Sequence, residues 1–153
     1  MNNLDPKSRI FVHVSIKLLL RKGDQILLLE SSTQSHRYDL PGGRINVGEW
    51  EKNFTDILTR EITEELGETI TYTIAPQNPS ILRFTSRTGK FDDNTPIRAI
   101  VLLYEGMYIT GDIQISSEHA SYTWVDSAQF DTTHCMVGEQ FGKGLNDYLH
   151  KPT

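Results

Sequence analysis

Three glutamates lie close together within the segment REITEELG, which covers residues 60–67. In a helix, which turns by about 100° per residue, Glu61, Glu64 and Glu65 would share one side. Two carboxylates about 5 Å apart repel by less than about 1 kcal/mol in water, but by roughly 3 kcal/mol at an effective dielectric constant near 20. An exposed cluster is therefore nearly harmless, whereas a cluster packed against a sheet requires a cation or protonation.

The apolar residues before this cluster indicate how such a helix would face the core. Trp50, Phe54 and Ile57 fall within about 60° of Glu61 on the helical wheel, so the glutamates continue the apolar stripe. A simple amphipathic helix would place its charges opposite that stripe. We therefore expect the carboxylates at the edge of the buried region, where Arg60 supplies only one positive charge. A solvated helix face remains the alternative when this segment is taken alone.

A glycine-rich turn precedes the acidic segment. The sequence Pro41-Gly42-Gly43 permits a tight turn with exposed backbone groups. A carbonyl in this turn can join the carboxylates as a further oxygen ligand. Hard oxygen ligands without a dedicated cage suit Mg²⁺, which keeps several waters and often binds substrate phosphates. The turn and the glutamates together favour a divalent cation site that bridges the protein to a diphosphate.

These two features belong to one longer motif. The segment GGRINVGEWEKNFTDILTREITEELG resembles the Nudix box, which reads G, five residues, E, seven residues, then R-E-apolar-x-E-E-x-G-apolar. Two departures exist: ten residues instead of seven separate Glu49 from Arg60, and Glu68 occupies the last apolar position. The matching residues are Gly43, Glu49, Arg60, Glu61, Ile62, Glu64, Glu65 and Gly67.

The resemblance to the Nudix hydrolase family, the MutT-like enzymes, carries expectations about fold and activity. It implies an α/β/α sandwich with a mixed sheet between helices. It also implies hydrolysis of a nucleoside diphosphate linked to another moiety, with Mg²⁺ or Mn²⁺ neutralising developing charge and activating water. The alternative is a Nudix-fold module that binds or senses a nucleotide with little catalysis, and the longer spacing keeps it open. The sequence does not indicate which nucleotide is bound.

Roles for individual residues also follow from the resemblance. Glu61, Glu64 and Glu65 would be metal ligands, and the backbone carbonyl of Gly42 would be another. Arg60 would orient the glutamates as their ion-pair partner, so that it and Glu61 belong to the catalytic group.

A later acidic residue completes the implied site. The segment EHASYTWVDSAQF, which begins at Glu118, resembles a later part of Nudix proteins in which an acid precedes a strand with tryptophan. Glu118 is therefore the candidate for an additional metal ligand or for the general base. His119 and Glu61 compete with it for the role of base.

The longer spacing within the box affects where Glu49 would lie relative to the metal. We expect the three extra residues to extend the helix at its N-terminal end, which rotates it by about 300° and adds a rise of about 4.5 Å. Glu49 would then be peripheral, or another acid such as Glu51 would take its place. The alternative is that the extra residues loop out and Glu49 keeps the usual position.

Three residues near the glycine-rich turn are candidates for binding the substrate. Arg37, Tyr38 and Arg44 can meet the phosphates or the base of a nucleotide. For each of them, an ordinary place on the protein surface is the alternative.

Apolar patterns predict the elements that position these residues. Residues 12–20 alternate between apolar and polar side chains, as in a strand, and the continuous apolar run QILLLE suggests a strand buried on both faces. The segment LPGGRINVGEW predicts a break, and a helix that ends at Gly67 should follow it. A separate short helix is expected later in the chain, with Asp126 as its N-terminal cap. Further strands are expected at residues 70–74, 81–85, 97–104 and around 122–125, and a further helix at 139–149.

Composition limits the class of protein. The chain has 153 residues, of which 37% are hydrophobic and 23% charged, and this predicts a single α/β domain over residues 1–153. The net charge of −5 argues against broad nucleic-acid binding, which requires clustered Lys and Arg. With one cysteine, no apparent signal segment and no apolar span, we expect a cytoplasmic protein that acts away from membranes. We expect a small-molecule nucleotide as its partner, and both a monomer and a homodimer remain open.

Overall fold

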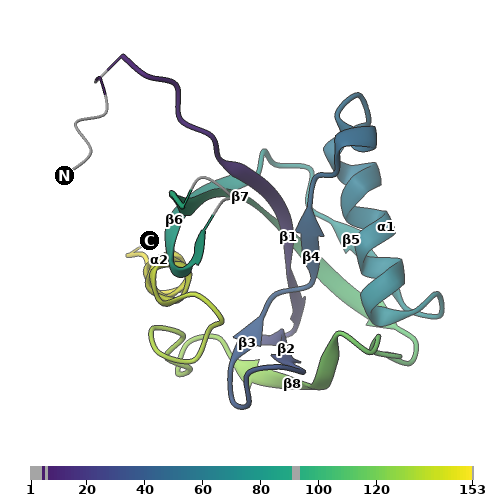
Figure 1. Ribbon diagram of the computed structural model, residues 1–153. Helices are drawn as coiled ribbons and strands as arrows, with labels where there is room; N and C mark the ends of the chain where they lie inside the picture. The colour runs from purple at the N-terminus through teal and green to yellow at the C-terminus, as the bar shows by residue number, and fades with distance from the viewer. Residues whose placement is uncertain (1–4, 6, 91–93, 153) are drawn as a thin grey trace.

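A mixed sheet lies at the centre of the computed structural model, which describes residue 5, residues 7–90 and residues 94–152. The described residues form an eight-stranded sheet with the order β3-β2-β1-β7-β5, to which β4, β6 and β8 add at β1, β7 and β2 (Figure 1). The strands are β1 (His13–Lys22), β2 (Gln25–Ser31), β3 (Tyr38–Asp39), β4 (Gly42–Arg44), β5 (Thr71–Ile74), β6 (Ser80–Lys90), β7 (Pro96–Thr110) and β8 (His119–Asp126). The helices are the short 3₁₀ helix η1 (Val47–Glu49), α1 (Phe54–Leu66) and α2 (Glu139–Leu149).

The two central strands run parallel, and their neighbours run antiparallel. β1 pairs with β7 in parallel from His13 opposite Ala99 to Arg21 opposite Met107. β2 pairs antiparallel with both β1 and β8. The expectation of a mixed sheet is therefore confirmed.

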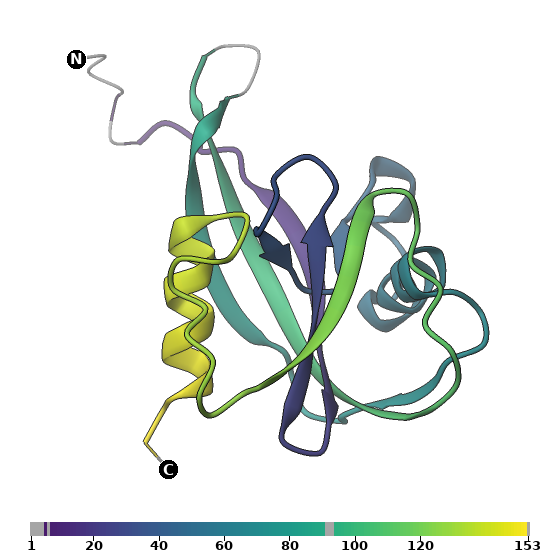
Figure 2. The ribbon, with the colours of Figure 1, turned by 90° about the horizontal axis from the view of Figure 1, so that it is seen from below.

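Side chains of the central strands alternate between two cores. Leu18 and Leu20 of β1 join Ile62 of α1 in one buried cluster. Leu19 points to the other face and joins Phe141 of α2 in a second cluster. α1 and α2 cover opposite faces of the sheet, as Figure 2 shows from below. The expected α/β/α sandwich and the two-sided burial of β2 are therefore confirmed, because β2 also contributes to both clusters.

The glycine-rich segment contains one strand, β4, which corrects the expectation of a simple break. β4 pairs with β1, with Gly42 opposite Lys17. Gly42 has a φ of +123°, and a Cβ atom there would lie 2.1 Å from the carbonyl oxygen of Ile16. Only glycine permits this close approach, which is why a segment without strand-forming residues still joins the sheet.

Asp126 also differs from the expectation, because it ends a strand and begins a turn instead of capping a short helix. Its Oδ1 accepts hydrogen bonds from the amides of Ala128 and Gln129, at 2.9 and 3.3 Å. Residues 127–129 form a turn. The side chain satisfies the same amides that an N-cap would satisfy, so the local signal is the same for both structures.

The helix that carries the glutamates begins at Phe54 and not near Trp50. The predicted apolar stripe is therefore wrong at its N-terminal end, where Trp50 is 67% exposed and Phe54 is 40% exposed. The three extra residues belong to a turn between η1 and α1, so the expected extension of the helix is also wrong. The helix ends as predicted, since the Gly67 amide donates to the carbonyl of Thr63 at 3.0 Å.

Within the described ranges, no helix is long and apolar enough to cross a membrane.

Candidate active site

Arg60, in the middle of α1, connects three carboxylates. Its Nε and Nη2 donate to the two carboxylate oxygens of Glu49, at 2.6 and 3.0 Å. Its Nη1 donates to Glu64 and its Nη2 to Glu61, both at 2.8 Å. Hydrogen bonding to these carboxylates raises the pKa of Arg60 in spite of its partial burial. The guanidinium therefore stays charged and fixes the directions of its partners.

Glu49 remains part of this network although the spacing in the box is longer. Its side chain is only 8% exposed, and it also accepts a hydrogen bond from the amide of Asn46 at 3.1 Å. The hydrogen bonds from Arg60 and then from Asn46 lower the pKa of Glu49. The expectation of a peripheral Glu49 replaced by Glu51 is therefore wrong. The extra residues loop out, and the exposed Glu51 lies in that loop.

Glu61 lies between Arg60 and the glycine-rich turn. A Cβ atom on Gly43 would lie 2.5 Å from Glu61 Oε1, so a larger residue there would displace the Glu61 carboxylate. Burial raises the pKa of Glu61, and the charges of Glu65 and Glu64 raise it further against the opposing effect of Arg60. Burial and the neighbouring carboxylates thus outweigh the effect of the Arg60 guanidinium on the pKa of Glu61.

Glu65 is the most enclosed of the three glutamates, with 8% of its side chain exposed. Its Oε2 accepts a hydrogen bond from the amide of Gly42 at 2.7 Å, and its Oε1 lies 3.0 Å from His119 Nε2. This contact with Glu65 raises the pKa of His119 in spite of burial. Within the described part of the chain, the buried Nδ1 of His119 has no hydrogen-bond partner.

Lys17 holds the turn that presents the Gly42 carbonyl. Its Nζ donates to Asp39 Oδ2 at 2.8 Å, to the carbonyl of Leu40 at 3.1 Å and to that of Gly42 at 2.9 Å. A carbonyl oxygen has two lone pairs, so Gly42 keeps one acceptor site for another group. Sequence reasoning missed this role. The feature of the sequence that could have indicated this role is a lysine on the polar face of an otherwise apolar strand.

The C-terminal end of α1 brings Glu118 to the same place. The amide of Gln114 donates to the carbonyl of Leu66 at 2.9 Å, and that of Ser116 to the carbonyl of Glu65 at 3.2 Å. This attached loop leads directly into β8, so Glu118 and His119 face Glu65. One ligand atom from each of these three residues lies within 4.8 Å of the others.

A cavity of about 510 Å³ joins most of the residues that the sequence predicts for the site. We call it the acidic cavity. Its lining also includes Asn46 and Ser116, which the sequence does not single out. The predicted residues that line it are Gly42, Arg44, Arg60, Glu61, Glu64, Glu65 and Glu118.

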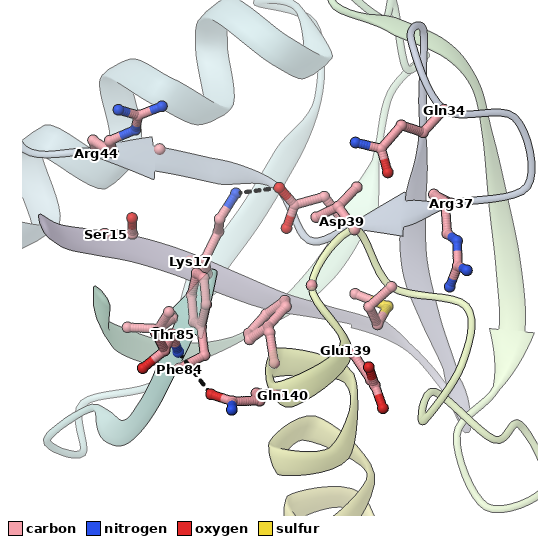
Figure 3. Close-up of a pocket in the computed structure, with 16 residues that line it drawn as sticks. Ser15, Lys17, Gln34, Arg37, Asp39, Arg44, Phe84, Thr85, Glu139 and Gln140 are labelled. Carbon is pink, nitrogen blue, oxygen red and sulfur yellow. Dashed lines mark hydrogen bonds and ion pairs between the residues drawn. The ribbon is translucent and has the colours of Figure 1, made fainter. Parts of the chain in front are cut away.

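A second cavity of about 440 Å³ lies on the other face of β4, toward α2. We call it the aromatic cavity, because Phe84 and Phe141 line it with their ring centroids 6.0 Å apart. Figure 3 shows Arg44 at one side of this cavity and Arg37 at the other. The Arg37 guanidinium donates to the carbonyl of His134.

Tyr38, in contrast, is not among the described residues that line either cavity, because its side chain packs against the cluster beneath α2. The structure thus brings Arg37 and Arg44 to the aromatic cavity and leaves Tyr38 outside it. Arg37 precedes β3 and Tyr38 is the first residue of that strand, so the two neighbours lie in different surroundings.

Comparison with solved structures shows the same fold in several proteins. A MutT protein from Methanosarcina mazei Go1 is 24% identical, with a TM-score of 0.67 over 92% of this chain and 96% of that one. An ADP-ribose pyrophosphatase from Streptococcus suis is 16% identical, with a TM-score of 0.62 over 91% of this chain and 90% of that one. A dihydroneopterin triphosphate pyrophosphohydrolase from E. coli is 14% identical, with a TM-score of 0.63 over 91% of this chain and 96% of that one.

Sequence comparison gives two results. No curated protein matches the chain in sequence. The NUDIX domain family, in contrast, matches residues 11–141, which include the whole box and all the residues that line the two cavities. The chain therefore belongs to the Nudix family of hydrolases.

Proposed function

We propose that the protein hydrolyses a phosphoanhydride bond in a nucleoside diphosphate linked to another moiety, in a reaction that requires Mg²⁺ or Mn²⁺. The observation that carries this proposal is the acidic cavity. In it, four carboxylates, those of Glu61, Glu64, Glu65 and Glu118, gather around two cations, Arg60 and Arg44, and Arg60 pairs with Glu61 and Glu64. Such an excess of carboxylates at a partly buried place favours a bound cation.

The donors in the acidic cavity fit a hard divalent cation. Glu61, Glu64, Glu65 and the free lone pair of the Gly42 carbonyl offer oxygen atoms only, which suits Mg²⁺ and Mn²⁺. Burial raises the pKa of Glu61 and its acidic neighbours raise it further, and a bound cation would oppose both effects. When bound, the cation would supply charge neutralisation at the phosphates and a more acidic water.

Protein residues then hold the substrate around that place. Arg44 is exposed and lines both the acidic and the aromatic cavity, so its guanidinium would bind phosphates that lie between them. The aromatic cavity would hold the nucleoside, with Phe84 against the base and Arg37 at the rim. Its volume of about 440 Å³ lies in the range of small-molecule sites.

Glu118 is the general base in this proposal. Its carboxylate is exposed and lines the acidic cavity, so it can take a proton from the attacking water. His119 is buried, and its Nε2 is engaged with Glu65. Glu61 is engaged with Arg60. Positioning Glu65 is therefore the role we assign to His119.

A metal-dependence assay across a substrate panel tests the proposal. The panel would contain ADP-ribose, a nucleoside triphosphate, a nucleotide sugar and a dinucleoside polyphosphate, each with Mg²⁺, with Mn²⁺ and with excess EDTA. We expect a divalent-dependent release of a nucleoside phosphate from at least one compound. Undiminished hydrolysis in EDTA would contradict the metal requirement. Nucleotide binding without turnover across the panel would favour the sensing module instead.

A further inference from the structure

A third cavity of about 340 Å³ lies beside the acidic cavity, at the start of β1 and the turn after β4. Its walls are mainly apolar, and we call it the Trp50 cavity. The proposed reaction does not yet use it. The lining residues that matter here are Val12, His13, Val14, Ile45, Val47 and Trp50.

Trp50 is the unusual residue in this lining. It follows directly after Glu49, in the turn that carries the longer spacing of the box, and its side chain is 67% exposed. Val47 beside it is 99% exposed. Large apolar side chains gathered at the surface mark binding sites more often than single exposed ones do. An exposed indole next to a phosphate site offers a flat face for stacking.

The three cavities meet at one side chain. Arg44 lines the aromatic, the acidic and the Trp50 cavities, and Asn46 lines the last two. The two substituents of a diphosphate bound at Arg44 can therefore extend in two directions. One leads past Lys17 into the aromatic cavity, and the other leads toward Trp50.

The chemistry of the Trp50 cavity favours an uncharged group over a further phosphate. Burial lowers the pKa of His13, and the charge of Arg44 lowers it further, so that its imidazole is neutral at pH 7. Arg44 is the only cationic side chain among the described residues that line the cavity, and in the proposed function it binds the diphosphate. The remaining walls offer aliphatic and aromatic surface together with one amide side chain.

We propose that the Trp50 cavity binds an uncharged planar group at the second end of the substrate, with the indole of Trp50 stacked on it. This inference rests on the proposed function, and it narrows the substrate class. The preferred substrate is a nucleoside diphosphate linked to a second nucleoside, in which both ends are bound. A nucleoside triphosphate would leave the Trp50 cavity empty.

Two probes that differ only at the second end test the inference. Diadenosine pyrophosphate carries adenosine on both phosphates, and the methyl ester of ADP carries a methyl group in place of the second adenosine. We would compare kcat and KM for both probes in the wild type, Trp50→Ala and Trp50→Phe. Ile81→Ala is the matched control, because Ile81 is also exposed, at 66%, and lies on β6.

The expected result is a selective loss in one variant. Trp50→Ala raises KM for diadenosine pyrophosphate by about 5- to 140-fold, which is the range that base–aromatic stacking gives. KM for the methyl ester changes less than twofold. Trp50→Phe retains most of the affinity, and Ile81→Ala retains all of it. An equal effect on both probes, or no effect on either, overturns the inference and leaves the proposed function intact.

Binding and self-association complete the test. If neither probe is hydrolysed by the wild type, the proposed function fails for these compounds. The inference about the Trp50 cavity is then tested by calorimetry, which measures the affinity of diadenosine pyrophosphate for the wild type and for Trp50→Ala. Equal affinities would overturn the inference. A second copy of the chain is the competing occupant. Sedimentation that shows a dimer of the wild type and a monomer of Trp50→Ala would assign the surface to that copy and overturn the inference.

Discussion

Arg60 binds Glu49 through two nearly parallel hydrogen bonds of 2.6 and 3.0 Å, although the two residues are 11 positions apart and a turn separates their elements. This bidentate pair fixes the guanidinium in the plane from which it also reaches Glu61 and Glu64. The positions of Glu61 and Glu64 thus depend on Glu49, a residue outside the helix that carries them.

The first prediction follows from this pair. Glu49→Gln replaces one charged acceptor of Arg60, and hydrogen bonds to charged groups contribute about 1.5–3 kcal/mol. We expect kcat at saturating Mg²⁺ to fall by roughly 10- to 150-fold, comparable to the loss in Glu65→Gln. Glu51→Gln is the control, because Glu51 is exposed in the neighbouring turn. A Glu49→Gln enzyme as active as Glu51→Gln would contradict this role.

The second prediction concerns Glu118 as the general base. A general base contributes about 10²- to 10⁴-fold, so Glu118→Gln should lose that much in kcat while KM changes little. A titration with Mg²⁺ separates this role from that of a metal ligand, since only loss of a ligand shifts the metal dependence. Activity within a few-fold of the wild type would direct the search for the base to His119 and Glu61.

The third prediction concerns the pH dependence of stability without metal. Because the folded protein has a raised pKa at Glu61, it binds more protons than the unfolded chain just above the usual pKa of 4.5. The free energy of unfolding therefore falls as pH rises through that window. Glu61→Gln should lack this part of the slope and have a higher Tm than the metal-free wild type at pH 7.

Thermal denaturation in EDTA between pH 4 and pH 7 measures this difference. The difference between the two curves isolates Glu61, because His119 and the other titrating groups are present in both proteins. Added Mg²⁺ should raise the Tm of the wild type more than that of the variant. Curves that stay parallel over the whole range would show that Glu61 is adequately compensated without a cation.

The fourth prediction compares two glycines in the box. Gly43→Ala would place a methyl group 2.5 Å from Glu61 Oε1, so the carboxylate must move. A displacement of about 1 Å at a reacting group lowers turnover by about 10²-fold. Gly48→Ala is the control, because a Cβ there has no neighbour within 4 Å. Equal activities of the two variants would mean that the approach of Gly43 to Glu61 does not matter for turnover.

The fifth prediction concerns the lysine that holds the turn. Lys17→Met removes three hydrogen bonds and leaves Asp39 without its partner at a place where the two side chains are only 12% and 25% exposed. We expect a loss of about 1.5–3 kcal/mol in the free energy of unfolding, measured by urea denaturation. Lys143→Met breaks an exposed ion pair with Glu139 and should change stability by less than about 0.5 kcal/mol. Similar values for both variants would exclude a special role for Lys17.

The sequence allowed the acidic site to be predicted where local spacing determines the geometry. Glu61, Glu64 and Glu65 share one side because helical spacing alone places them there. The two-faced burial of β2 could likewise be predicted from a continuous apolar run.

Features that depend on distant segments could not be predicted in this way. Strand β4 forms because Gly42 approaches the backbone of Ile16, a contact that no local pattern encodes. Glu49 keeps its place because Arg60 holds it, which spacing along a helix cannot indicate. Arg37 lines the aromatic cavity whereas its neighbour Tyr38 packs into the cluster beneath α2, a difference that depends on the packing of α2.

The parallel pairing of β1 with β7 has a consequence for how the chain folds. His13 lies opposite Ala99, so the central pair of the sheet joins segments 86 residues apart. Contacts of such large sequence separation slow folding, because a long loop must close before its contacts stabilise it. Until β7 has been synthesised, one edge of β1 has no strand beside it. A ribosome-bound chain that stops before Pro96 therefore exposes an apolar strand edge, and such edges favour aggregation. A chaperone that binds the incomplete chain would prevent this aggregation.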